Sequence, residues 1–220
     1  MDGTRVVLIR HGESRAQEQR IIGGHDGCAG LSELGRRQAK ALAERLAASG
    51  ELADASALYA SMMPRAAETA SIIADAVGGH EIVQDCDLCE HHPGEGDGLS
   101  YEEYDRRWPV TGRTWDPDLR RAPGSETWSE MAVRVARGLD AVIERHRGET
   151  VVVACHGGVI VHSLVRWLEL GLGSEHERAW LNPVNTSLTE WRFGESPWDP
   201  SGMALELVRF NDHAHLAGVS

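Results

Sequence analysis

Arg5-Val-Val-Leu-Ile9 is followed at once by Arg10-His-Gly-Glu13. The first five residues are rich in branched apolar side chains, which is typical of a strand buried on both faces of a sheet. The polar residues begin where that strand ends, and the glycine lets another group approach the backbone closely. This stretch therefore predicts a buried strand that carries Arg10 and His11 at its carboxyl end.

The same arrangement recurs twice further along the chain. Thr150–Cys155 has the clearest pattern of a buried strand, and it runs into His156-Gly-Gly158. Ala57–Ala60 is a shorter strand, followed by Ser61 and Arg65. Ligands of open parallel sheets bind beyond the carboxyl ends of the strands, so we expect the polar residues of all three strands to meet at one edge.

Segments with helical periodicity separate these strands, which is the pattern of a parallel sheet covered by helices. The first of them has Ser32 as its N-cap and stops at Gly50, and the longest has Ser125 or Thr127 near its cap and stops at Gly148. The sequence therefore predicts an α/β fold with a mostly parallel central sheet. The expected helices cover residues 31–48, 65–77, 125–147 and 158–170, and a further strand covers 81–83.

The side chains at the strand ends carry positive charge or can gain it. Two guanidinium groups and two imidazoles at one sheet edge would repel one another unless an anion lay between them. Phosphate suits such a site, because arginine binds it through a planar fork and helix N-termini offer unpaired N–H groups. One histidine at a strand end is commonly an isolated polar group, but two His-Gly pairs at matching positions indicate a phosphate site. Its predicted residues are Arg10, His11, Arg65 and His156.

Length and charge limit the alternatives. The 220 residues, of which 41% are hydrophobic and 25% charged, fit one globular domain spanning 1–220. Lys plus Arg number 22 and Asp plus Glu 34, which gives a net charge of −12. Such a chain has no basic footprint for nucleic acid and no polybasic patch for a membrane. Positive charge for an anionic ligand must therefore be concentrated locally.

The amino-terminal residues predict no export signal. Met1–Thr4 lacks the basic start and the long apolar run of a signal peptide, and no apolar stretch reaches the roughly 18 residues of a membrane helix. Four cysteines in a chain of this length are too few for a disulfide framework, so we expect reduced thiols and, by default, a cytoplasmic location. These cysteines are Cys28, Cys86, Cys89 and Cys155.

Cys86 and Cys89 form a CxxC pair, but no second pair follows to complete a zinc site. His91 and His92 stand nearby, and adjacent histidines rarely bind one ion together. We therefore expect neither a metal nor another cofactor.

Residues 88–124, here called the excursion, break the strand–helix pattern. The segment is rich in glycine and contains two tryptophans, and we expect a partly helical structure that covers the active site. Its arginines are offset by neighbouring acidic residues, although one or two of them could contact a second anionic group of the substrate. They are Arg106, Arg107, Arg113, Arg120 and Arg121.

Leu8-Ile-Arg-His-Gly-Glu-Ser14 resembles the RHGE signature of the histidine phosphatase superfamily, also called the phosphoglycerate mutase-like family. The late His156-Gly-Gly158 matches the same family, and weaker matches extend over almost the whole chain. This resemblance implies a three-layer α/β/α fold. The weaker matches are Leu31–Gly35, Ser61–Ala70, Leu88–Glu90, Pro123–Glu126, Asn185–Ser187 and Asn211–Leu216.

The resemblance also implies roles for individual residues. His11 would attack phosphorus and form a phosphohistidine, while Arg10, Arg65 and His156 would hold the phosphoryl oxygens. Glu90 would protonate the leaving group and later deprotonate the attacking water. Glu95 stands close by and is the alternative acid.

Three further residues are implied as phosphate ligands. Gln17 takes the position at which the family often has asparagine, and Gly24 matches a glycine whose backbone N–H binds phosphate. Gly157 follows the second histidine and would offer its N–H at the start of a helix.

Mutases of this family typically carry Arg-His-Tyr-Gly after the acid, followed by a basic insertion. Residues 90–98 of this chain read Glu-His-His-Pro-Gly-Glu-Gly-Asp-Gly, which is acidic and rich in glycine. The resemblance therefore favours a metal-independent phosphatase acting on a small phosphorylated metabolite. A phosphoglycerate mutase-type phosphotransferase and a non-catalytic phospholigand-binding module stay open as alternatives, and so does a homodimer, because the family includes monomers, dimers and tetramers.

Overall fold

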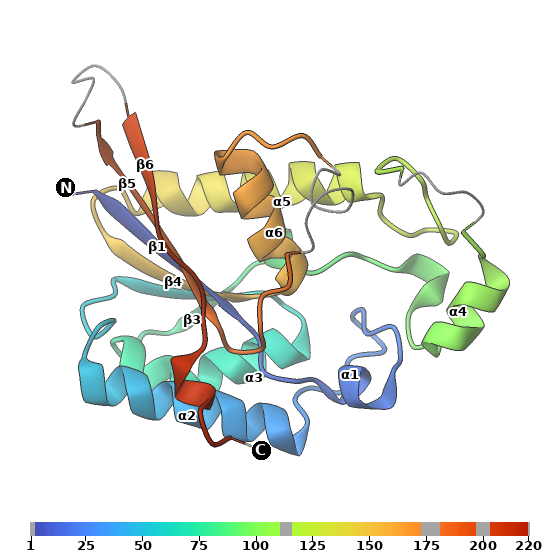
Figure 1. The fold of residues 1–220 in the computed structure, drawn as a ribbon, viewed down its shortest axis with the longest axis horizontal. Coiled ribbons are helices and arrows are strands. Elements are labelled where there is room, and N and C mark those ends of the chain that lie inside the picture. Colours follow the sequence, from blue (N-terminus) through green and yellow to red (C-terminus); the bar gives the residue numbers. More distant parts are fainter. Residues whose placement is uncertain (1–2, 111–115, 173–180, 197–202, 220) are drawn as a thin grey trace.

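The computed structural model describes residues 3–110, 116–172, 181–196 and 203–219, and a six-stranded sheet lies at its centre (Figure 1). The strand order is β3-β2-β4-β1-β5-β6. The first four strands in this order are parallel, and β5 and β6 add two antiparallel pairings at one side. The strands are β1 Thr4–Arg10, β2 Ala57–Ala60, β3 Ile82–Gln84, β4 Thr150–Cys155, β5 Leu188–Glu195 and β6 Met203–Asp212.

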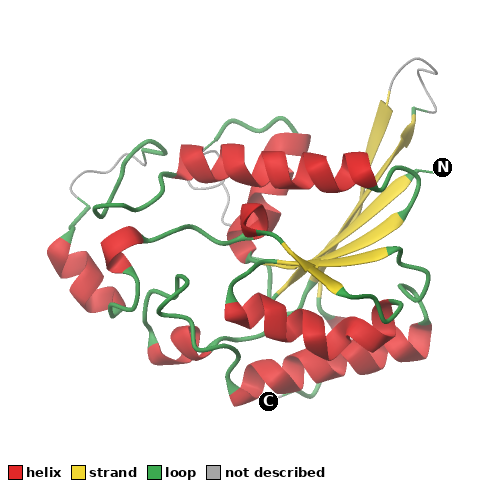
Figure 2. Cartoon of the chain, turned by 180° about the vertical axis from the view of Figure 1, so that it is seen from behind, coloured by secondary structure: helices red, strands yellow, loops and turns green. Residues whose placement is uncertain are grey.

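Helices cover both faces of this sheet, as the view from behind also shows (Figure 2). Helices α2 and α3 lie on one side, and α5 and α6 lie on the other. The predicted three-layer α/β/α architecture with a mostly parallel sheet is confirmed. The helices are α1 Arg15–Gln19, α2 Glu33–Ser49, α3 Pro64–Ile73, α4 Tyr101–Arg107, α5 Trp128–Arg145 and α6 Gly157–Trp167. Short 3-10 turns are η1 Ala74–Val77, η2 Cys86–Leu88, η3 Gly94–Gly96 and η4 Ala214–Leu216.

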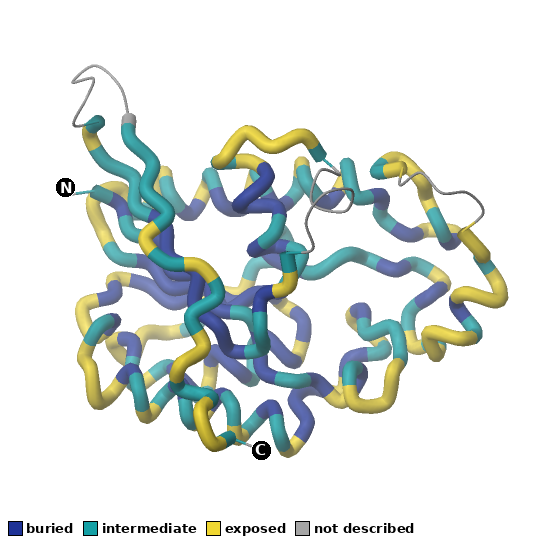
Figure 3. The backbone as a smooth tube through the Cα atoms, viewed as in Figure 1, coloured by how far each residue is buried: buried dark blue, intermediate teal, exposed yellow. Residues whose placement is uncertain are grey.

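Alternate residues of the continuous apolar run of β1 pack into two hydrophobic cores, one on each face of the sheet. Val6 and Leu8 point to the core under α5 and α6, whereas Val7 and Ile9 point to the core under α2 and α3. All four side chains are fully buried, and the central strands form the darkest part of the tube in Figure 3. A strand buried on both faces cannot alternate apolar and polar residues, which explains the sequence pattern.

The helix boundaries follow their capping residues. The Ser32 hydroxyl accepts the N–H of Gly35 at the start of α2, and Gly50 ends that helix with φ +66°. Thr127 and Glu130 form a reciprocal capping box at the start of α5. Of the two predicted caps for this helix, Thr127 is the one that the structure uses.

The sequence pattern did not predict β5 and β6. Buried polar residues interrupt the apolar pattern in β5, where Glu190 is 3% exposed. Its carboxylate is paired with Arg5 at 2.7 Å and with Arg209 at 3.0 Å. This ion pairing depends on residues far apart in the sequence, so a local hydrophobicity pattern could not reveal it.

The excursion contains η3 and α4, as the expectation of a partly helical segment required. It pairs with the loop after α1, because the Ile22 N–H donates to Leu99 and the Gly98 N–H donates back to Ile22, at 2.7 and 2.8 Å. Arg113 lies outside the described residues. None of the described helices is long and apolar enough to span a membrane.

Candidate active site

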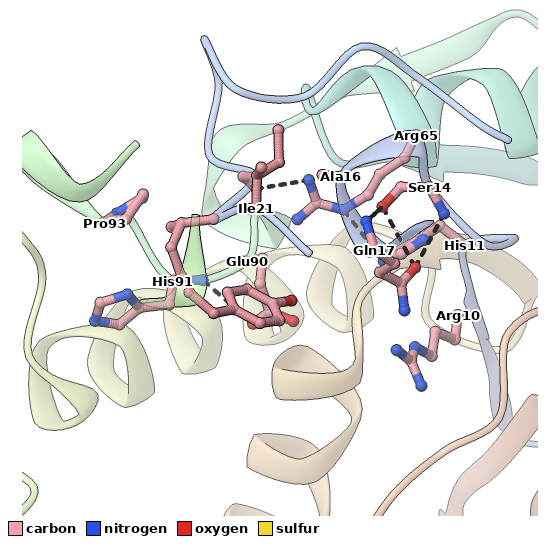
Figure 4. A pocket seen from close by; sticks show the side chains of 13 residues that line it. Arg10, His11, Ser14, Ala16, Gln17, Ile21, Arg65, Glu90, His91 and Pro93 are labelled. Carbon is pink, nitrogen blue, oxygen red and sulfur yellow. Dashed lines mark hydrogen bonds between the residues drawn. The ribbon is translucent and has the colours of Figure 1, made fainter. Parts of the chain in front are cut away.

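A cavity of about 260 Å³ lies at the carboxyl edge of the parallel strands (Figure 4). It is bordered by the end of β1, the start of α3, the loop after α1 and the beginning of the excursion. The structure thus brings residues from distant parts of the sequence to one site. The lining residues are Arg10, His11, Ser14, Ala16, Gln17, Ile21, Ile22, Gly23, Arg65, Glu90, His91, Pro93 and Tyr101.

His11 is buried at the floor of this cavity, with 4% of its surface exposed. Its Nδ1–H donates to the carbonyl of Gly12 at 2.6 Å, which leaves a lone pair on Nε2. Arg65 approaches that nitrogen with its Nε at 3.2 Å. Burial, together with the charges of Arg65 and Arg10, holds the pKa of His11 well below its ordinary value. The ring is therefore a neutral imidazole whose free lone pair is on Nε2.

Arg65 lies in the first turn of α3, and contacts with Gly23 and Met63 hold its side chain in place. Its Nη1 donates to the carbonyl of Gly23 at 2.7 Å, and its Nη2 contacts the sulfur of Met63 at 3.2 Å. Thr69 on the same helix accepts the N–H of Gly12, which ties the loop after His11 to α3. These contacts fix the guanidinium beside His11, in a position that a ligand for phosphate oxygens would need.

Arg10 is the second cation of the site. Its Nη1 donates to the carbonyl of Pro183, but its Nε is buried without a hydrogen-bond partner among the described residues. Burial lowers the pKa of Arg10; the negative charge of Glu90 opposes this shift and the positive charge of Arg65 adds to it. An anion bound between Arg10 and Arg65 would relieve both the burial cost and the repulsion.

His156 lies directly beside His11, with a distance of 5.0 Å between the two ring centroids. The side chain is fully buried, and its Nε2 is 2.8 Å from the hydroxyl of Ser61. Its Nδ1 has no partner among the described residues, although a buried ring nitrogen normally has one. The predicted meeting of the two histidines is thus observed, and Ser61 orients the second of them.

Glu90 borders the cavity, whereas the alternative acid Glu95 is exposed and does not line it. The N–H of Gly158, in the first turn of α6, donates to Glu90 Oε2 at 3.0 Å. A Cβ added to Gly158 would lie 2.1 Å from Glu90 Oε1. The second glycine of His156-Gly-Gly158 therefore makes room for the carboxylate. The predicted role of the Gly157 N–H in binding phosphate stays a prediction.

Gln17 lines the cavity, as its predicted role requires. Its side-chain oxygen accepts from the N–H of Ser14 at 3.0 Å and from Asn185 at 3.3 Å. Its Nε2 group is consequently the end that can face an anion. Asn185 also donates to the carbonyl of His11 at 2.9 Å, a positioning contact that the sequence analysis did not assign.

The predicted use of the Gly24 amide is wrong for this structure. The N–H of Gly24 donates to the carboxylate of Asp97 at 2.7 Å, and Gly24 does not line the cavity. The Asp97 carboxylate also accepts the N–H groups of Asp26 and Gly27, at 2.9 Å each. The Asp97 carboxylate of the excursion thus binds three N–H groups of the loop after α1. Gly23, and not Gly24, borders the cavity. Local sequence could not reveal this contact, since 73 residues separate Gly24 from Asp97.

A second cavity of about 310 Å³ adjoins the first and shares Ile22, Glu90, His91 and Pro93 with it. Tyr104, Leu119, Glu126 and Trp128 extend its walls. Among the excursion's described arginines, only Arg121 borders this cavity, where it lies over the Tyr104 ring at 4.4 Å and pairs with Asp105. The others pair elsewhere: Arg106 and Arg107 with Glu103, and Arg120 with Glu130.

The fold and these side chains define an α/β protein with a cationic, histidine-containing pocket at the edge of its sheet. The model of the histidine phosphatase superfamily (branch 1) matches residues 6–205. The chain therefore belongs to the histidine phosphatase superfamily.

Individual relatives include both phosphatases and mutase-like proteins. The chain is 36% identical to phosphoglycerate mutase-like protein 4 of Arabidopsis thaliana over 163 residues, which cover 73% of this chain and 69% of the relative. It is 31% identical to metal-independent phosphoserine phosphatase of the same plant over 191 residues, or 86% and 79% of the two chains. A solved mycobacterial glucosyl-3-phosphoglycerate phosphatase shares the fold with a TM-score of 0.73 and 25% identity, covering 94% of this chain and 98% of that one. The chain spans about half the length of the mycobacterial relatives that it matches at 36% identity.

Proposed function

We propose that this protein is a phosphatase that hydrolyses phosphate monoesters through a phosphohistidine on His11, without a catalytic metal. The observation that carries the proposal is the hydrogen bond from His11 Nδ1–H to Gly12, at 2.6 Å. It selects the tautomer in which Nε2 is the nucleophile and directs that atom toward Arg65 and the cavity.

In the first step, His11 Nε2 attacks phosphorus and the bond from phosphorus to the leaving oxygen breaks. Arg10 and Arg65 neutralise the charge on the phosphoryl oxygens, and His156, which takes up a proton on its unpaired Nδ1 as the anion binds, donates to the same group. Glu90 enters as the neutral acid and gives its proton to the leaving alkoxide. The products of this step are an alcohol and a phosphohistidine.

In the second step, water attacks the phosphohistidine from the side that the alcohol has left. Glu90 takes a proton from that water, the bond between phosphorus and Nε2 breaks, and inorganic phosphate forms. His11 returns to the neutral tautomer because its Nδ1 proton stays bonded to Gly12 throughout. One carboxyl group can serve both steps. The first step leaves Glu90 as a carboxylate, which the second step needs as its base, and the second step restores the protonated acid.

The size of the site supports a small phosphorylated metabolite as substrate. The cavity of about 260 Å³ receives the phosphate, and the adjoining one of about 310 Å³ receives the rest of the molecule. Relatives named for phosphoserine and for glucosyl-3-phosphoglycerate support the same class of substrate. We therefore propose that the aromatic walls from Tyr104 and Trp128 contact the leaving group.

Hydrolysis of p-nitrophenyl phosphate, with EDTA added only to the assay, tests the proposal. The wild-type protein should release p-nitrophenol and phosphate in equal amounts, and His11→Ala should lower the rate at least roughly 10³-fold. His213→Ala, at an exposed histidine, is the matched control and should keep the wild-type rate. Acid quenching of the wild-type reaction should trap an acid-labile phosphoenzyme that His11→Ala does not form.

Two other outcomes would contradict the proposal. Turnover of 3-phosphoglycerate only with a bisphosphate primer would identify a mutase, which hands the phosphoryl group back instead of to water. Tight binding of inorganic phosphate without turnover of any monoester would identify a binding module. A screen of phosphate monoesters, with phosphoserine among them, then ranks substrates by kcat/KM.

A further inference from the structure

Four potential metal ligands meet beside the active-site cavity but do not line it. They are His25, Cys86, Cys89 and His92, and one ligand atom from each lies within 4.8 Å of the others. The Cys86 sulfur is 3.6 Å from His25 Nε2 and 3.7 Å from His92 Nε2. His91, the histidine next to His92, is not part of this group, since its Nε2 contacts the carbonyl of Glu126 at 2.5 Å.

These distances fit a tetrahedral metal site. Zinc bonds of about 2.3 Å to sulfur and about 2.0–2.1 Å to nitrogen place neighbouring ligands of a regular tetrahedron roughly 3.3–3.8 Å apart. Both measured sulfur-to-nitrogen distances fall within that range, and the widest separation needs a contraction of about 1 Å. Two thiols and two imidazoles form a donor set that selects Zn²⁺ over hard cations such as Mg²⁺.

We propose that His25, Cys86, Cys89 and His92 bind a structural Zn²⁺. Four protein ligands complete a tetrahedral shell and leave no position for water, so the ion takes no part in phosphoryl transfer. This inference is independent of the proposed function, and it departs from the expectation that the CxxC pair has no partners.

The surroundings of the cysteines support a built site. Arg134 on α5 donates to the carbonyls of Cys86 and Cys89 at 3.1 and 2.9 Å, so the turn between them is held in one conformation. The hydroxyl of Ser61 donates to the sulfur of Cys89 at 3.2 Å, a contact that would also stabilise a metal-bound thiolate. Cys89 is fully buried, whereas His25 is exposed, so an ion can enter from the surface.

The site would fasten two segments that border the catalytic pocket. His25 follows the loop whose Gly23 carbonyl accepts from Arg65, and Cys89 directly precedes Glu90. Ser61 in turn contacts His156, so the cysteine side is connected to the second histidine through one hydroxyl. One ion would thus hold the loop after α1 against the start of the excursion.

Weak hydrogen bonds offer a competing explanation for the same distances. A thiol has a single proton, so Cys86 can donate to only one of the two imidazoles and must accept from the other. In that case the exposed His25 would contribute little to stability. A zinc ligand at this position would contribute a great deal, because its removal opens the coordination shell.

Metal content of the purified full chain tests the proposal directly. Protein from a zinc-supplemented culture, dialysed without chelator, should contain about one Zn²⁺ per chain by mass spectrometry. His25→Ala and Cys86→Ser should each lower zinc affinity by at least about 100-fold, more than is typical for loss of a group that only hydrogen-bonds to a ligand. His213→Ala and Cys28→Ser are the matched controls outside the cluster, and both should retain the ion.

Cobalt gives a readout that does not depend on folding of a variant. Wild-type protein stripped of zinc and titrated with Co²⁺ should show the visible d–d bands of a tetrahedral site and the near-ultraviolet charge transfer of thiolate ligands. In His25→Ala, these bands should appear only at much higher Co²⁺ concentration, with circular dichroism confirming the fold.

A folded wild-type chain that contains no zinc and gives no tetrahedral Co²⁺ spectrum under reducing conditions would overturn the inference. The same holds if His25→Ala keeps its zinc after equal dialysis. These measurements use the resting protein without substrate. A purified chain that hydrolyses the monoester but binds no zinc would contradict only the proposed metal site. A chain that binds zinc but hydrolyses no monoester would contradict only the proposed phosphatase activity.

Discussion

At the residue scale, the site depends on which nitrogen or oxygen each side chain presents. Gly12 sets the tautomer of His11, and Ser61 contacts Nε2 of His156, so each ring is held through one defined nitrogen. Glu90 is set by the N–H of Gly158. Each of these three side chains thus has a neighbour that fixes its orientation, which is the condition for electrostatic preorganisation.

Glu90→Gln separates the two roles proposed for the carboxyl group. With p-nitrophenyl phosphate, whose leaving group needs no proton, we expect a burst of about one p-nitrophenol per chain followed by turnover slowed about 10²–10⁴-fold. With an alkyl phosphate we expect slow turnover and no burst, because the first step itself needs the acid. Rapid-mixing kinetics measures both.

Glu95→Gln is the control for this experiment, because Glu95 is exposed outside the cavity. It should behave as the wild type with both substrates. A loss confined to Glu95→Gln would reverse the assignment of the acid.

At the element scale, the start of α6 and one residue of α5 position Glu90. The N–H of Gly158 in the first turn of α6 donates to Glu90, and Arg134 of α5 donates to backbone carbonyls of residues 86–90. The Arg134 guanidinium donates to the carbonyls of Asp87 and Glu90 as well as to those of the two cysteines, and pairs with Glu126 at 2.6 Å. The sequence pattern predicts both helices but not the irregular segment 86–90, and side-chain and backbone contacts from the two helices hold that segment in place.

Gly158→Ala should impair catalysis more than folding. The new methyl group would displace the Glu90 carboxylate, a movement of about 1 Å or more that costs roughly 10²-fold in kcat for an alkyl phosphate. Stability should stay within about 1 kcal/mol of the wild type, because alanine suits a helix better than glycine and the contacted atoms belong to flexible side chains. Gly171→Ala, in open space, is the control and should leave kcat unchanged.

Arg134→Met should destabilise the protein by about 3 kcal/mol in urea unfolding, because it leaves Glu126 and several carbonyls without their partner. The Arg134 side chain is only 11% exposed. Arg137→Met, one turn further along the helix, removes an ion pair to Asp87 whose arginine is 66% exposed, and it should lower the free energy of unfolding far less than Arg134→Met. Equal losses in the two variants would contradict a special role for Arg134.

At the scale of the whole molecule, buried histidines link stability to pH. Burial lowers the pKa values of His11 and His156, and it lowers the pKa of His215 to about 4 with the help of Arg45. In the unfolded chain these rings titrate near 6.5. As pH falls below about 6.5, these histidines bind protons in the unfolded chain but not in the folded chain. Their contribution to the free energy of unfolding is therefore fully present above this pH and is lost progressively below it.

His215→Gln should flatten this acid loss. Between pH 6.5 and about 4, the free energy of unfolding of the wild type should fall more steeply than that of the variant, by at most about 1.4 kcal/mol per pH unit. Urea unfolding at a series of pH values measures the difference. His213→Gln replaces an exposed ring and serves as the control, and parallel curves for the wild type and His215→Gln would contradict the assignment.

Sequence alone predicted the parallel part of the sheet, its helices and the residues at the strand ends. Strands β2 and β4 were predicted with the same bounds that the structure shows. Local pattern suffices here, because a strand buried on both faces needs a continuous apolar run, and a parallel sheet necessarily gathers the residues after its strands at one edge. The sequence therefore predicted that Arg10, His11, Arg65 and His156 lie close together, while their roles in the reaction stay a prediction.

The contacts between loops at that edge became known only from the folded chain. It showed that Asp97 binds the Gly24 amide, that Glu90 rather than Glu95 borders the cavity, and that His25 joins the CxxC pair. Each of these contacts joins residues of irregular segments or of distant parts of the chain, and loops have no periodicity from which such pairing could be predicted. Loop positions are set by long-range hydrogen bonds, such as the one between Gly24 and Asp97, and these form only in the completed fold.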